Sequence, residues 1–354
     1  MLEIYKNKKV LITGNTGFKG SWLTLILKMA GAHVIGYSDK KPLTKATIND
    51  AWIKKNIIQY YNKIENVNTL RKVIRTENPD IIFHLAAQPI VLESYKKPRK
   101  TFLTNILGTV NLLDSIKNIN QSIPILITTT DKVYASKNEK LKELDNLNGI
   151  DPYSVSKVCT ENIAKCYSDI GLKIITARAG NVIGGGDWSK DRIIPDIMRS
   201  YFCKKPISIR NPSYTRPWLY ILDAIEGYLV IGKKLLNINT KNYFNCYNLA
   251  PNYKKSFSVL DLTKIIQKKL AVKTILFDVN TFQKENKYLR LDAKKIQKEL
   301  GWVSKTSLNE ALKNTANWYL EAYKKNNLEY TKKQILNHFS KDNIKMYKTE
   351  KKYA

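Results

Sequence analysis

A glycine-rich loop near the start of the chain limits the fold more than any other feature of the sequence. Residues 10–12 form a short apolar run typical of a buried strand, and Gly14, Gly17 and Gly20 follow directly. Residues 17–29 then carry the pattern of a helix. Glycines let the backbone approach a pyrophosphate, and the N-terminus of a helix offers free N–H donors. The order strand, loop, helix therefore predicts a dinucleotide-binding unit.

Short apolar runs and longer amphipathic segments alternate through the rest of the first half. Further strands, apolar on both faces, are expected at residues 33–37, 81–83, 123–127 and 173–177. Helices are expected between them at residues 68–75, 101–116 and 153–170. Strands of this kind separated by helices predict a parallel sheet covered on both faces. The expected fold class is α/β, a doubly wound parallel sheet of the Rossmann type.

The regular pattern stops near residue 180. Three glycines at 184–186 and several prolines then interrupt the periodicity. We expect a dinucleotide-binding Rossmann domain at 1–180 and a smaller α/β substrate lobe at 181–330, partly interleaved with the first. The polar, Lys-rich residues 331–354 are expected to form a basic C-terminal tail, as a surface helix or a loose segment.

An acidic residue after the second expected strand bears on the choice of cofactor. Asp39 follows Gly20 at the distance where a carboxylate can accept from ribose hydroxyls, which favours NAD. Lys40 and Lys41 could instead meet a 2′-phosphate. NADP therefore stays open as the alternative.

A tyrosine and a lysine four residues apart form the main catalytic candidate. Tyr153 and Lys157 share one face of the helix expected at 153–170, and a positive neighbour is expected to lower the pKa of a tyrosine. A phenolate can take the proton of a hydroxyl while hydride leaves for a nicotinamide. The strand that ends at residues 128–130 should bring its carboxyl end to the same crevice.

The chain is strongly basic, with 60 Lys and Arg against 30 Asp and Glu and a net charge of +30. Such a charge fits a nucleic-acid or anionic-membrane surface. The basic residues are nevertheless scattered as doublets, and no zinc-finger or RNA-binding motif accompanies them. We favour a Lys-rich composition without a nucleic-acid or membrane partner, with an anionic small-molecule substrate as a contributor.

Cysteine usage and hydropathy indicate the compartment. The four cysteines form no C-x-x-C motif and are expected to stay reduced, and no metal site is expected. No signal peptide is expected, because residues 1–9 are charged and run directly into a strand. The apolar residues 22–36 are interrupted by Lys28 and His33 and are too polar to span a membrane. These features predict a cytoplasmic protein.

Several long and distinctive strings support a family assignment. They are the loop at 14–20, His-Leu-Ala-Ala-Gln at 84–88, Tyr-Ser-Val-Ser-Lys at 153–157 and Arg-Ala-Gly-Asn at 178–181. Together they resemble the extended short-chain dehydrogenase/reductase superfamily over nearly the whole chain. The strings at 14–22, 129–134, 151–157, 179–188 and 209–218 further resemble its CDP-glucose 4,6-dehydratase branch.

The tripeptide Thr130-Asp131-Lys132 decides the branch, since related hexose dehydratases usually carry Thr-Asp-Glu here. The resemblance implies a mechanism. Tyr153 and Thr130 handle the 4-hydroxyl of the sugar as hydride passes from C4 to NAD. Lys132 then removes the C5 proton, protonated Asp131 releases the C6 hydroxyl as water, and the hydride returns to C6.

The resemblance also implies two sets of binding residues. The cofactor set is Gly14, Thr16, Gly17, Phe18, Lys19, Gly20, Asp39, Leu85, Ala86, Ala87, Tyr153 and Lys157. The substrate set is Gln88, Asn181, Arg192, Arg210, Arg216 and Glu285. A nucleotide sugar carries a diphosphate, which arginines suit, although any single arginine serves equally well in a surface ion pair.

The chain departs from the family pattern at two places. Leu219-Tyr220 replaces a common Gln-His pair, and Lys63 replaces an acidic residue expected near the adenine. Two alternatives to the dehydratase therefore remain: a nucleotide-sugar 4-epimerase or 4-keto reductase, and a basic non-catalytic binding protein. Similar enzymes assemble through the helices at about 101–116 and 153–170, so a homodimer or tetramer is expected.

Overall fold

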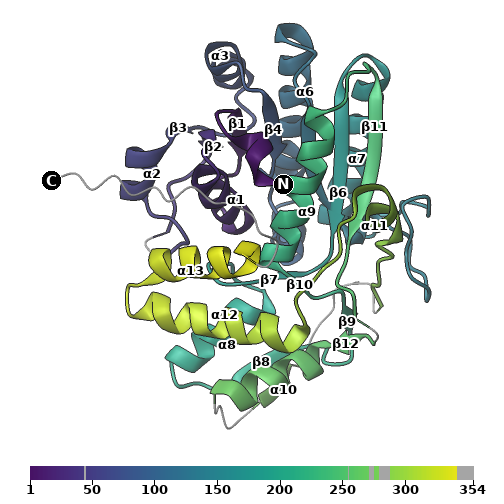
Figure 1. Ribbon diagram of the computed structural model, residues 1–354. Helices are drawn as coiled ribbons and strands as arrows, with labels where there is room; N and C mark the ends of the chain where they lie inside the picture. Colours follow the sequence, from purple (N-terminus) through teal and green to yellow (C-terminus); the bar gives the residue numbers. More distant parts are fainter. Residues whose placement is uncertain (44, 254, 271–274, 279–287, 341–354) are drawn as a thin grey trace, which may run out of the picture.

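The computed structural model describes residues 1–43, 45–253, 255–270, 275–278 and 288–340 (Figure 1). Among these residues, no helix has the length and apolar character needed to cross a bilayer. The four cysteines, Cys159, Cys166, Cys203 and Cys246, are all free thiols, as expected.

A seven-stranded parallel sheet forms the frame of the molecule, in the order β11-β6-β5-β4-β1-β2-β3. The strands are β1 (Lys9–Thr13), β2 (His33–Ser38), β3 (Ile58–Tyr61), β4 (Ile81–His84), β5 (Ile125–Thr130), β6 (Lys173–Ala179) and β11 (Tyr243–Leu249). In β1, Val10 and Ile12 belong to one buried cluster and Leu11 to another. Successive side chains therefore enter two cores, one on each face of the sheet.

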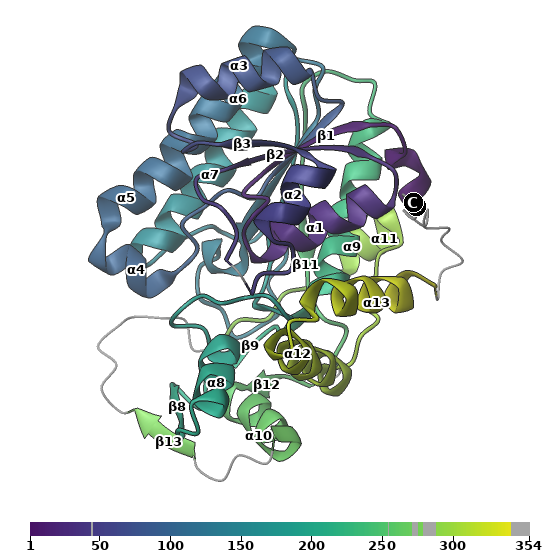
Figure 2. The ribbon, with the colours of Figure 1, turned by 90° about the vertical axis from the view of Figure 1, so that its left-hand side faces the viewer.

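Helices cover both faces, which confirms the doubly wound fold. The helices α1 (Phe18–Met29) and α9 (Ile221–Leu236) lie on one face, and α3 (Val67–Glu77), α6 (Gly108–Ile119) and α7 (Pro152–Asp169) on the other (Figure 2). The helix expected at 101–116 is one continuous helical stretch with a π-turn: α5 (Pro98–Phe102), the π-helical Leu103–Leu107, and α6.

Some short elements were not expected from the sequence. They are the 3-10 helices Leu2–Tyr5 and Asp131–Val133, the helices α2 (Asp50–Asn56) and α4 (Val91–Lys96), and strand β3. Strand β3 lies at the sheet edge with its residues half-buried or exposed, so its sequence lacks the apolar character of the inner strands.

The second lobe lies against the carboxyl ends of the strands (Figure 2). Its small sheets pair β7 (Val182–Ile183) with β10 (Leu219–Tyr220), β8 (Ile207–Arg210) with β13 (Ile275–Asp278), and β9 (Thr215–Arg216) with β12 (Phe257–Ser258). Its helices are α8 (Ile193–Phe202), α10 (Val259–Leu270), α12 (Leu308–Tyr323) and α13 (Asn327–Ser340).

The chain crosses between the lobes more than once. After β7, α8 and β8 it returns to the sheet as α9 and β11, and α11 (Lys294–Leu300) packs against both of these elements. Strand β11 pairs with β6 from Tyr243 to Leu249, so the outer strand of the sheet comes from residues beyond 180. The two lobes are therefore interleaved in sequence.

The first ten residues of the expected basic tail at 331–354 belong to a helix packed on the core, and are not a loose segment. Helix α13 extends to Ser340, and its Thr331, Ile335 and Phe339 are fully buried. These residues recur every four positions, so they form a narrow apolar stripe that packs on the core while the lysines between them face outward. Residues 341–354 lie outside the described residues.

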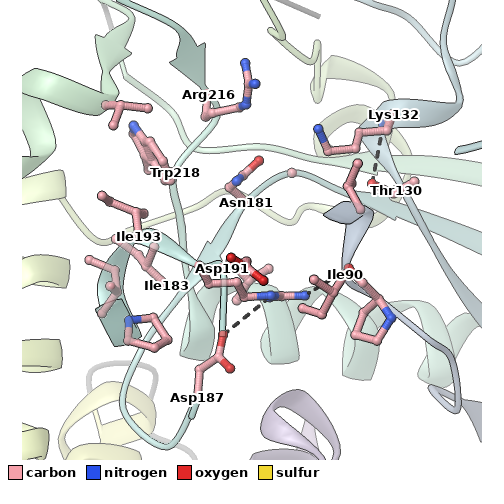
Figure 3. Close-up of a pocket in the computed structure, with 18 of the residues that line it drawn as sticks. Ile90, Thr130, Lys132, Asn181, Ile183, Asp187, Asp191, Ile193, Arg216 and Trp218 are labelled. Atoms are coloured by element: carbon pink, nitrogen blue, oxygen red, sulfur yellow. Dashed lines mark hydrogen bonds and ion pairs between the residues drawn. The ribbon is translucent and has the colours of Figure 1, made fainter. Parts of the chain in front are cut away.

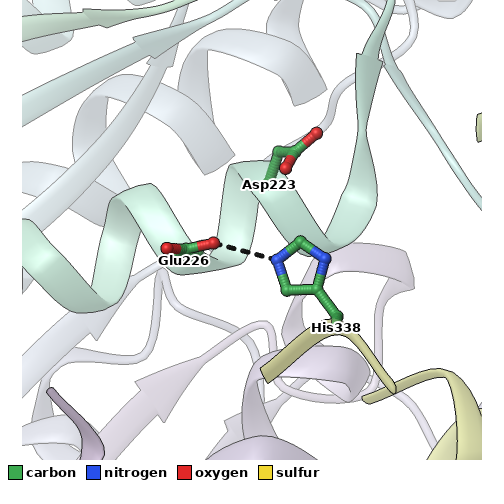
Figure 4. A group of neighbouring side chains, drawn as sticks. All are labelled: Asp223, Glu226 and His338. Carbon is green, nitrogen blue, oxygen red and sulfur yellow. Dashed lines mark hydrogen bonds and ion pairs between the residues drawn. The ribbon is translucent and has the colours of Figure 1, made fainter. Parts of the chain in front are cut away.

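A cluster of charged side chains anchors α13 to α9. His338 Nε2 lies 2.9 Å from Glu226 Oε2, and Asp223 stands next to both (Figure 4). Asp223 accepts from Ser304 Oγ and from the N–H of Lys305, and the Lys305 amine binds Glu226 at 2.9 Å. Each carboxylate of the cluster thus already has protein donors, and the cluster holds the C-terminal helix in place.

Candidate active site

The glycine loop has the shape that a bound diphosphate requires. A Cβ at Gly20 would lie 2.1 Å from Gly14 O, so the loop can lie against α1 only without a side chain there. Gly17 is the N-cap of α1 and is exposed, so the first N–H groups of the helix face outward. Thr16 steadies the loop by donating its hydroxyl to Lys40 O at 2.9 Å.

The remaining expected cofactor residues follow the same edge of the sheet. Asp39 is exposed directly after β2, beside the loop. Leu85, Ala86 and Ala87 follow β4, where the N–H of Leu85 donates to Thr13 O at 3.0 Å. A strip of backbone therefore runs along the carboxyl ends of β2, β1 and β4, the edge at which a doubly wound sheet binds a dinucleotide.

A buried histidine lies beneath this strip. His84 Nδ1 lies 2.7 Å from Thr13 Oγ1, and its Nε2 lies 3.2 Å from Thr109 Oγ1. Burial, with Lys157 contributing, lowers the pKa of His84 to about 3. His84 is therefore neutral and ties β4 to β1 and α6, a structural role that the sequence did not reveal.

The end of β5 presents the tripeptide that the sequence singled out. The chain turns there into the 3-10 helix Asp131–Val133, and the N–H of Lys132 donates to Thr130 Oγ1 at 3.3 Å. Thr130 Oγ1 donates to Asp131 Oδ1 at 3.0 Å. Figure 3 shows Thr130 and Lys132 on one side of a pocket, with Arg216 and Trp218 on the other.

Asp131 is the most constrained acid of the pocket. Its side chain is buried, and its Oδ2 meets no hydrogen-bond donor within the part of the chain that the structure describes. Burial raises the pKa of Asp131, and the positive charges of Lys132 and Arg216 offset only part of that effect. The site therefore favours a protonated carboxyl group that can donate.

Helix α7 places the tyrosine and the lysine in the same pocket region. Asp151 caps the helix by accepting from the N–H of Ser154 at 2.9 Å, and Pro152 starts it. Tyr153 lines the pocket, and its hydroxyl shares a hydrogen bond with Thr130. Tyr153, Thr130 and Asp131 are thus brought together as expected.

The expected effect of Lys157 on Tyr153 is wrong for this structure. Burial raises the pKa of Tyr153 to about 12, and the Thr130 hydrogen bond and Arg192 counteract it only in part. The Lys157 amine donates to Thr128 O at 3.0 Å, so it does not act on the phenol. Burial, and next the charge of Lys19, lower the pKa of Lys157 itself to about 7.

A buried ion pair next to Thr129 and Lys157 helps to hold the end of β5 in place. Glu161 lies one helical turn beyond Lys157 and binds Arg178 with both oxygens, at 3.0 Å to Nε and 2.9 Å to Nη2. Thr129 also donates to Glu161, so the pair fixes the residue next to Thr130. The sequence analysis missed Glu161, although its spacing of four from Lys157 was a usable signal.

The second lobe supplies the arginines, and it pairs two of them with carboxylates that the sequence analysis did not select. Arg192 Nη1 lies 3.4 Å from Asp187 Oδ2, and Arg210 Nη1 lies 3.7 Å from Asp191 Oδ1. Arg216 donates to Thr215 O at 2.9 Å. All three arginines line the pocket, as does Asn181. Anionic and cationic groups therefore alternate along this wall.

Gln88 is an expected substrate residue that does not line the pocket. Gln88 donates to Thr101 Oγ1 at 2.9 Å and accepts from the N–H of Ile90, so its side chain is held within its own loop and α5. Glu285 lies outside the described residues. The unusual Leu219 and Tyr220 are buried in β10 behind the pocket, while the neighbouring Trp218 lines it.

Comparison with known proteins places this geometry in a family. The sequence profile of the GDP-mannose 4,6-dehydratase family matches residues 11–315. The CDP-glucose 4,6-dehydratase of Salmonella typhimurium is 34% identical over 333 residues, which cover 90% of this chain and 92% of that protein. The chain belongs to the GDP-mannose 4,6-dehydratase family.

Two further comparisons, one of sequence and one of structure, show more distant similarities. The CDP-paratose 2-epimerase of Salmonella typhi is 26% identical and covers 88% of this chain and 98% of its own. The crystal structure of a dTDP-glucose 4,6-dehydratase from Bacillus anthracis in complex with NAD superposes with a TM-score of 0.76 at 22% identity, over 89% of this chain and 97% of that one. The resemblance to the extended short-chain dehydrogenase/reductase superfamily is thereby confirmed.

Proposed function

We propose that this member of the GDP-mannose 4,6-dehydratase family is an NAD-dependent hydro-lyase that converts CDP-glucose to CDP-4-keto-6-deoxyglucose. The observation that carries the proposal is the buried Asp131, with its raised pKa, beside Lys132 in the pocket that Tyr153 also lines. An acid and an amine at one site suit the removal of water next to a ketone.

The cofactor assignment rests on the glycine loop and on Asp39. Gly14, Gly17 and Gly20 leave room for a diphosphate at the N-terminus of α1, and the exposed Asp39 suits ribose hydroxyls. A nicotinamide dinucleotide held by these residues would supply the hydride acceptor for C4 of the sugar and the hydride donor for C6. The residues of the chain handle the protons.

The protons move through the four side chains at the ends of β5 and α7. Tyr153, in its phenolate form and hydrogen-bonded to Thr130, takes the proton of the 4-hydroxyl as C4 is oxidised. Burial raises the pKa of this phenol, and the positive charge that a bound oxidised nicotinamide would bring opposes that rise. The C4 ketone acidifies the C5–H bond, and the Lys132 amine takes that proton. Asp131 gives its proton to the C6 hydroxyl, which leaves as water as the C5–C6 double bond forms. The hydride would then be returned to C6 while Lys132 gives its proton back to C5. Proton exchange with solvent returns Tyr153 and Asp131 to their starting forms, so the net change is the loss of one water.

The second lobe at 181–330 is proposed to hold the nucleotide diphosphate. Arg192, Arg210 and Arg216 line the pocket with Asn181, and planar guanidinium groups suit phosphate oxygens. The choice of CDP-glucose follows the relative from Salmonella typhimurium, which is a CDP-glucose 4,6-dehydratase. Leu219 and Tyr220 lie behind the pocket wall, so their departure from the family pattern leaves the lining unchanged.

The test is a panel of CDP-, dTDP-, GDP- and UDP-glucose incubated with the full chain and scored by mass spectrometry for the loss of one water. The expected result is water loss with CDP-glucose at a rate well above the others. An unchanged mass together with an inverted C4 centre, read by NMR, would instead identify a 4-epimerase. Tight DNA retention that falls steeply with salt, without any sugar turnover, would identify a basic binding protein.

We also propose a homo-oligomer, a dimer or tetramer, that works in the cytoplasm. Leu107, Tyr95, Val155 and Ile150 are exposed apolar side chains on or near α4, the π-turn and α7. They lie on the face expected from the helices at 101–116 and 153–170, and burying them would favour association. Light scattering of the purified chain should give a mass of at least twice 40.8 kDa.

A further inference from the structure

One carboxylate of the pocket, that of Asp196, is held by a residue outside the pocket. Asp196 belongs to the first turn of α8 and lines the pocket, and its Oδ1 accepts from Arg199 one turn further along the helix. Arg199 does not line the pocket, and its guanidinium also donates to Trp188 O at 3.1 Å and to Ser189 O at 2.9 Å. These hydrogen bonds fix the orientation of the Asp196 carboxylate.

The second oxygen of this carboxylate is open to a bound molecule. Among the residues that the structure describes, the hydrogen bond of Asp196 to a side chain is the one from Arg199 to Oδ1. Asp187 and Asp191, by contrast, are paired with arginines that line the pocket themselves. Asp196 Oδ2 is therefore the acceptor that the second lobe can offer to a ligand.

Asp196 combines partial burial with a negative charge. Burial raises the pKa of this carboxyl, and the hydrogen bond and charge of Arg199, with the charge of Arg210, oppose that rise and favour the carboxylate. A carboxylate that water covers only in part interacts strongly with a polar group placed against it. It therefore attracts hydrogen-bond donors and repels acceptors.

The surroundings of Asp196 suit the edge of a flat ring. Helix α8 packs against β8, and both elements line this side of the pocket together with the segment that follows β8. Its apolar and aromatic residues are Ile193, Pro195, Ile209, Tyr214 and Val259. Apolar surfaces can hold the faces of a ring while one polar group selects among the substituents at its edge.

Under the proposed function, the nucleobase comes to this side of the pocket. The sugar lies at Tyr153 and Asp131, and the diphosphate lies at the arginines of the second lobe. The base is the opposite end of the same molecule, so it lies beyond the diphosphate. Arg210 ends β8, and its charge acts on Asp196, which places this carboxylate next to the diphosphate site on the side away from the sugar.

We propose that Asp196 selects a cytosine base by accepting a hydrogen bond from its 4-amino group. Uracil and thymine carry a carbonyl oxygen at that position, and a carboxylate repels it. The inference rests on the proposed function and deepens it, because it derives the preference for a cytidine nucleotide from a residue of this chain. Asp196 takes no part in proton transfer.

The experiment measures the affinities of CDP and UDP for the full chain by calorimetry at neutral pH. The two nucleotides differ in the base alone, and wild type should bind CDP more tightly by about tenfold or more. Asp196→Asn presents an amide that can turn either its oxygen or its NH2 group to the base. This variant should lower the ratio Kd(UDP)/Kd(CDP) about tenfold, by weakening CDP and tightening UDP.

A ligand variant and a matched protein variant complete the test. CDP with two methyl groups on N4 has no amino hydrogen, so wild type should bind it no better than UDP, and this measurement needs no mutant to fold. Asp191→Asn removes a carboxylate that is paired with Arg210, and it should change both affinities alike.

Two kinds of failure are distinguishable. Equal affinities of wild type for CDP and UDP, an unchanged ratio in Asp196→Asn, or tight binding of the dimethylated CDP would overturn the inference while leaving the dehydratase proposal in place. Absence of water loss from every nucleotide sugar with wild type would overturn the proposed function itself.

Discussion

The two walls of the pocket are built in different ways. The wall formed by the sheet carries Thr130, Asp131 and Tyr153, all buried, at the end of a strand and the start of a helix, with the buried Lys157 one turn further along that helix. The wall formed by the second lobe carries Arg192 and Arg210, whose side chains are each 32% exposed and paired with Asp187 and Asp191. The first wall is dry and fixed by backbone geometry. The second is partly hydrated, since Arg192 and Arg210 are partly exposed and ion-paired whereas Arg216 is buried.

The difference separates chemistry from recognition. In a dry environment, burial outweighs neighbouring charges, as the raised pKa values of Asp131 and Tyr153 and the lowered value of Lys157 show. In a hydrated environment, an arginine can exchange a carboxylate for a phosphate at little cost. Changes to the sheet wall should therefore act on the reaction and on folding, and changes to the second lobe on affinity.

The largest expected effect is that of Asp131→Asn. The amide cannot donate a carboxylic proton to the C6 hydroxyl, so water loss should fall by about 10²–10⁴-fold. Oxidation at C4 needs no acid, so reduced nicotinamide should accumulate in its absorbance band when CDP-glucose is added. The variant should also unfold about 1–3 °C higher at pH 8, because it no longer buries an acid whose pKa burial raises. Loss of the oxidation step as well would show that Asp131 does not act after it.

Breaking the buried ion pair between Arg178 and Glu161 should have the next largest effect, on the free energy of unfolding. Arg178→Leu leaves Glu161 buried without its partner, which should cost about 3–5 kcal/mol in the free energy of unfolding. The matched control is Asp169→Asn, which breaks the exposed pair with Lys165 and should cost less than about 0.5 kcal/mol. Urea unfolding of both variants makes the comparison, and equal losses would contradict the distinction between dry and hydrated pairs.

Acid should destabilise the sheet wall through His84. Burial lowers its pKa in the folded chain to about 3, whereas an unfolded histidine binds a proton near pH 6.5, so the stability that His84 contributes is lost as pH falls between these values. The loss should be about 2 kcal/mol between pH 7 and pH 5. Urea unfolding at both pH values measures it. His84→Gln should be less stable at pH 7 and should lose less on acidification.

The smallest effects should come from the hydrated wall. Arg210→Gln and Arg216→Gln should raise KM for CDP-glucose, about three-fold and about ten-fold, with kcat nearly unchanged. The rise in KM should be larger for Arg216→Gln because the Arg216 side chain is buried, while Arg210 is partly exposed and paired with Asp191. Steady-state kinetics give both constants. A drop in kcat without a change in KM would place these arginines with the chemical groups instead.

The contrast between the two walls also explains which site residues could be predicted from the sequence. Thr130 to Lys132 are contiguous, and Tyr153 and Lys157 share a helix face, so local geometry and the strand-end rule placed them correctly. Asp187 and Asp191 were not predicted as site residues. They belong to the site only through ion pairs with arginines that the fold brings close to them. The pKa of Tyr153 was misjudged for a related reason, since a charged neighbour is visible in a sequence and the depth of burial is not.

Features that depend on contacts between residues distant in sequence were not predicted either. Periodicity identifies a strand but not the sheet that it joins, so β11 could not be assigned to the sheet from its own residues. In α13, lysines around the stripe of Thr331, Ile335 and Phe339 made a packed helix look like a tail. Where a residue's environment came from its near neighbours in sequence, the prediction held.

The late arrival of β11 has a consequence for how the chain is made. Until Leu249 has left the ribosome, β6 is the outermost strand of a nascent sheet, with a row of backbone groups open to any passing strand. A fragment ending near residue 180 would keep that open edge permanently and should aggregate. The segment that supplies β8 and β9 lies in sequence between β6 and β11, two neighbouring strands of one sheet, so the second wall of the pocket is made before the sheet of the first wall is complete.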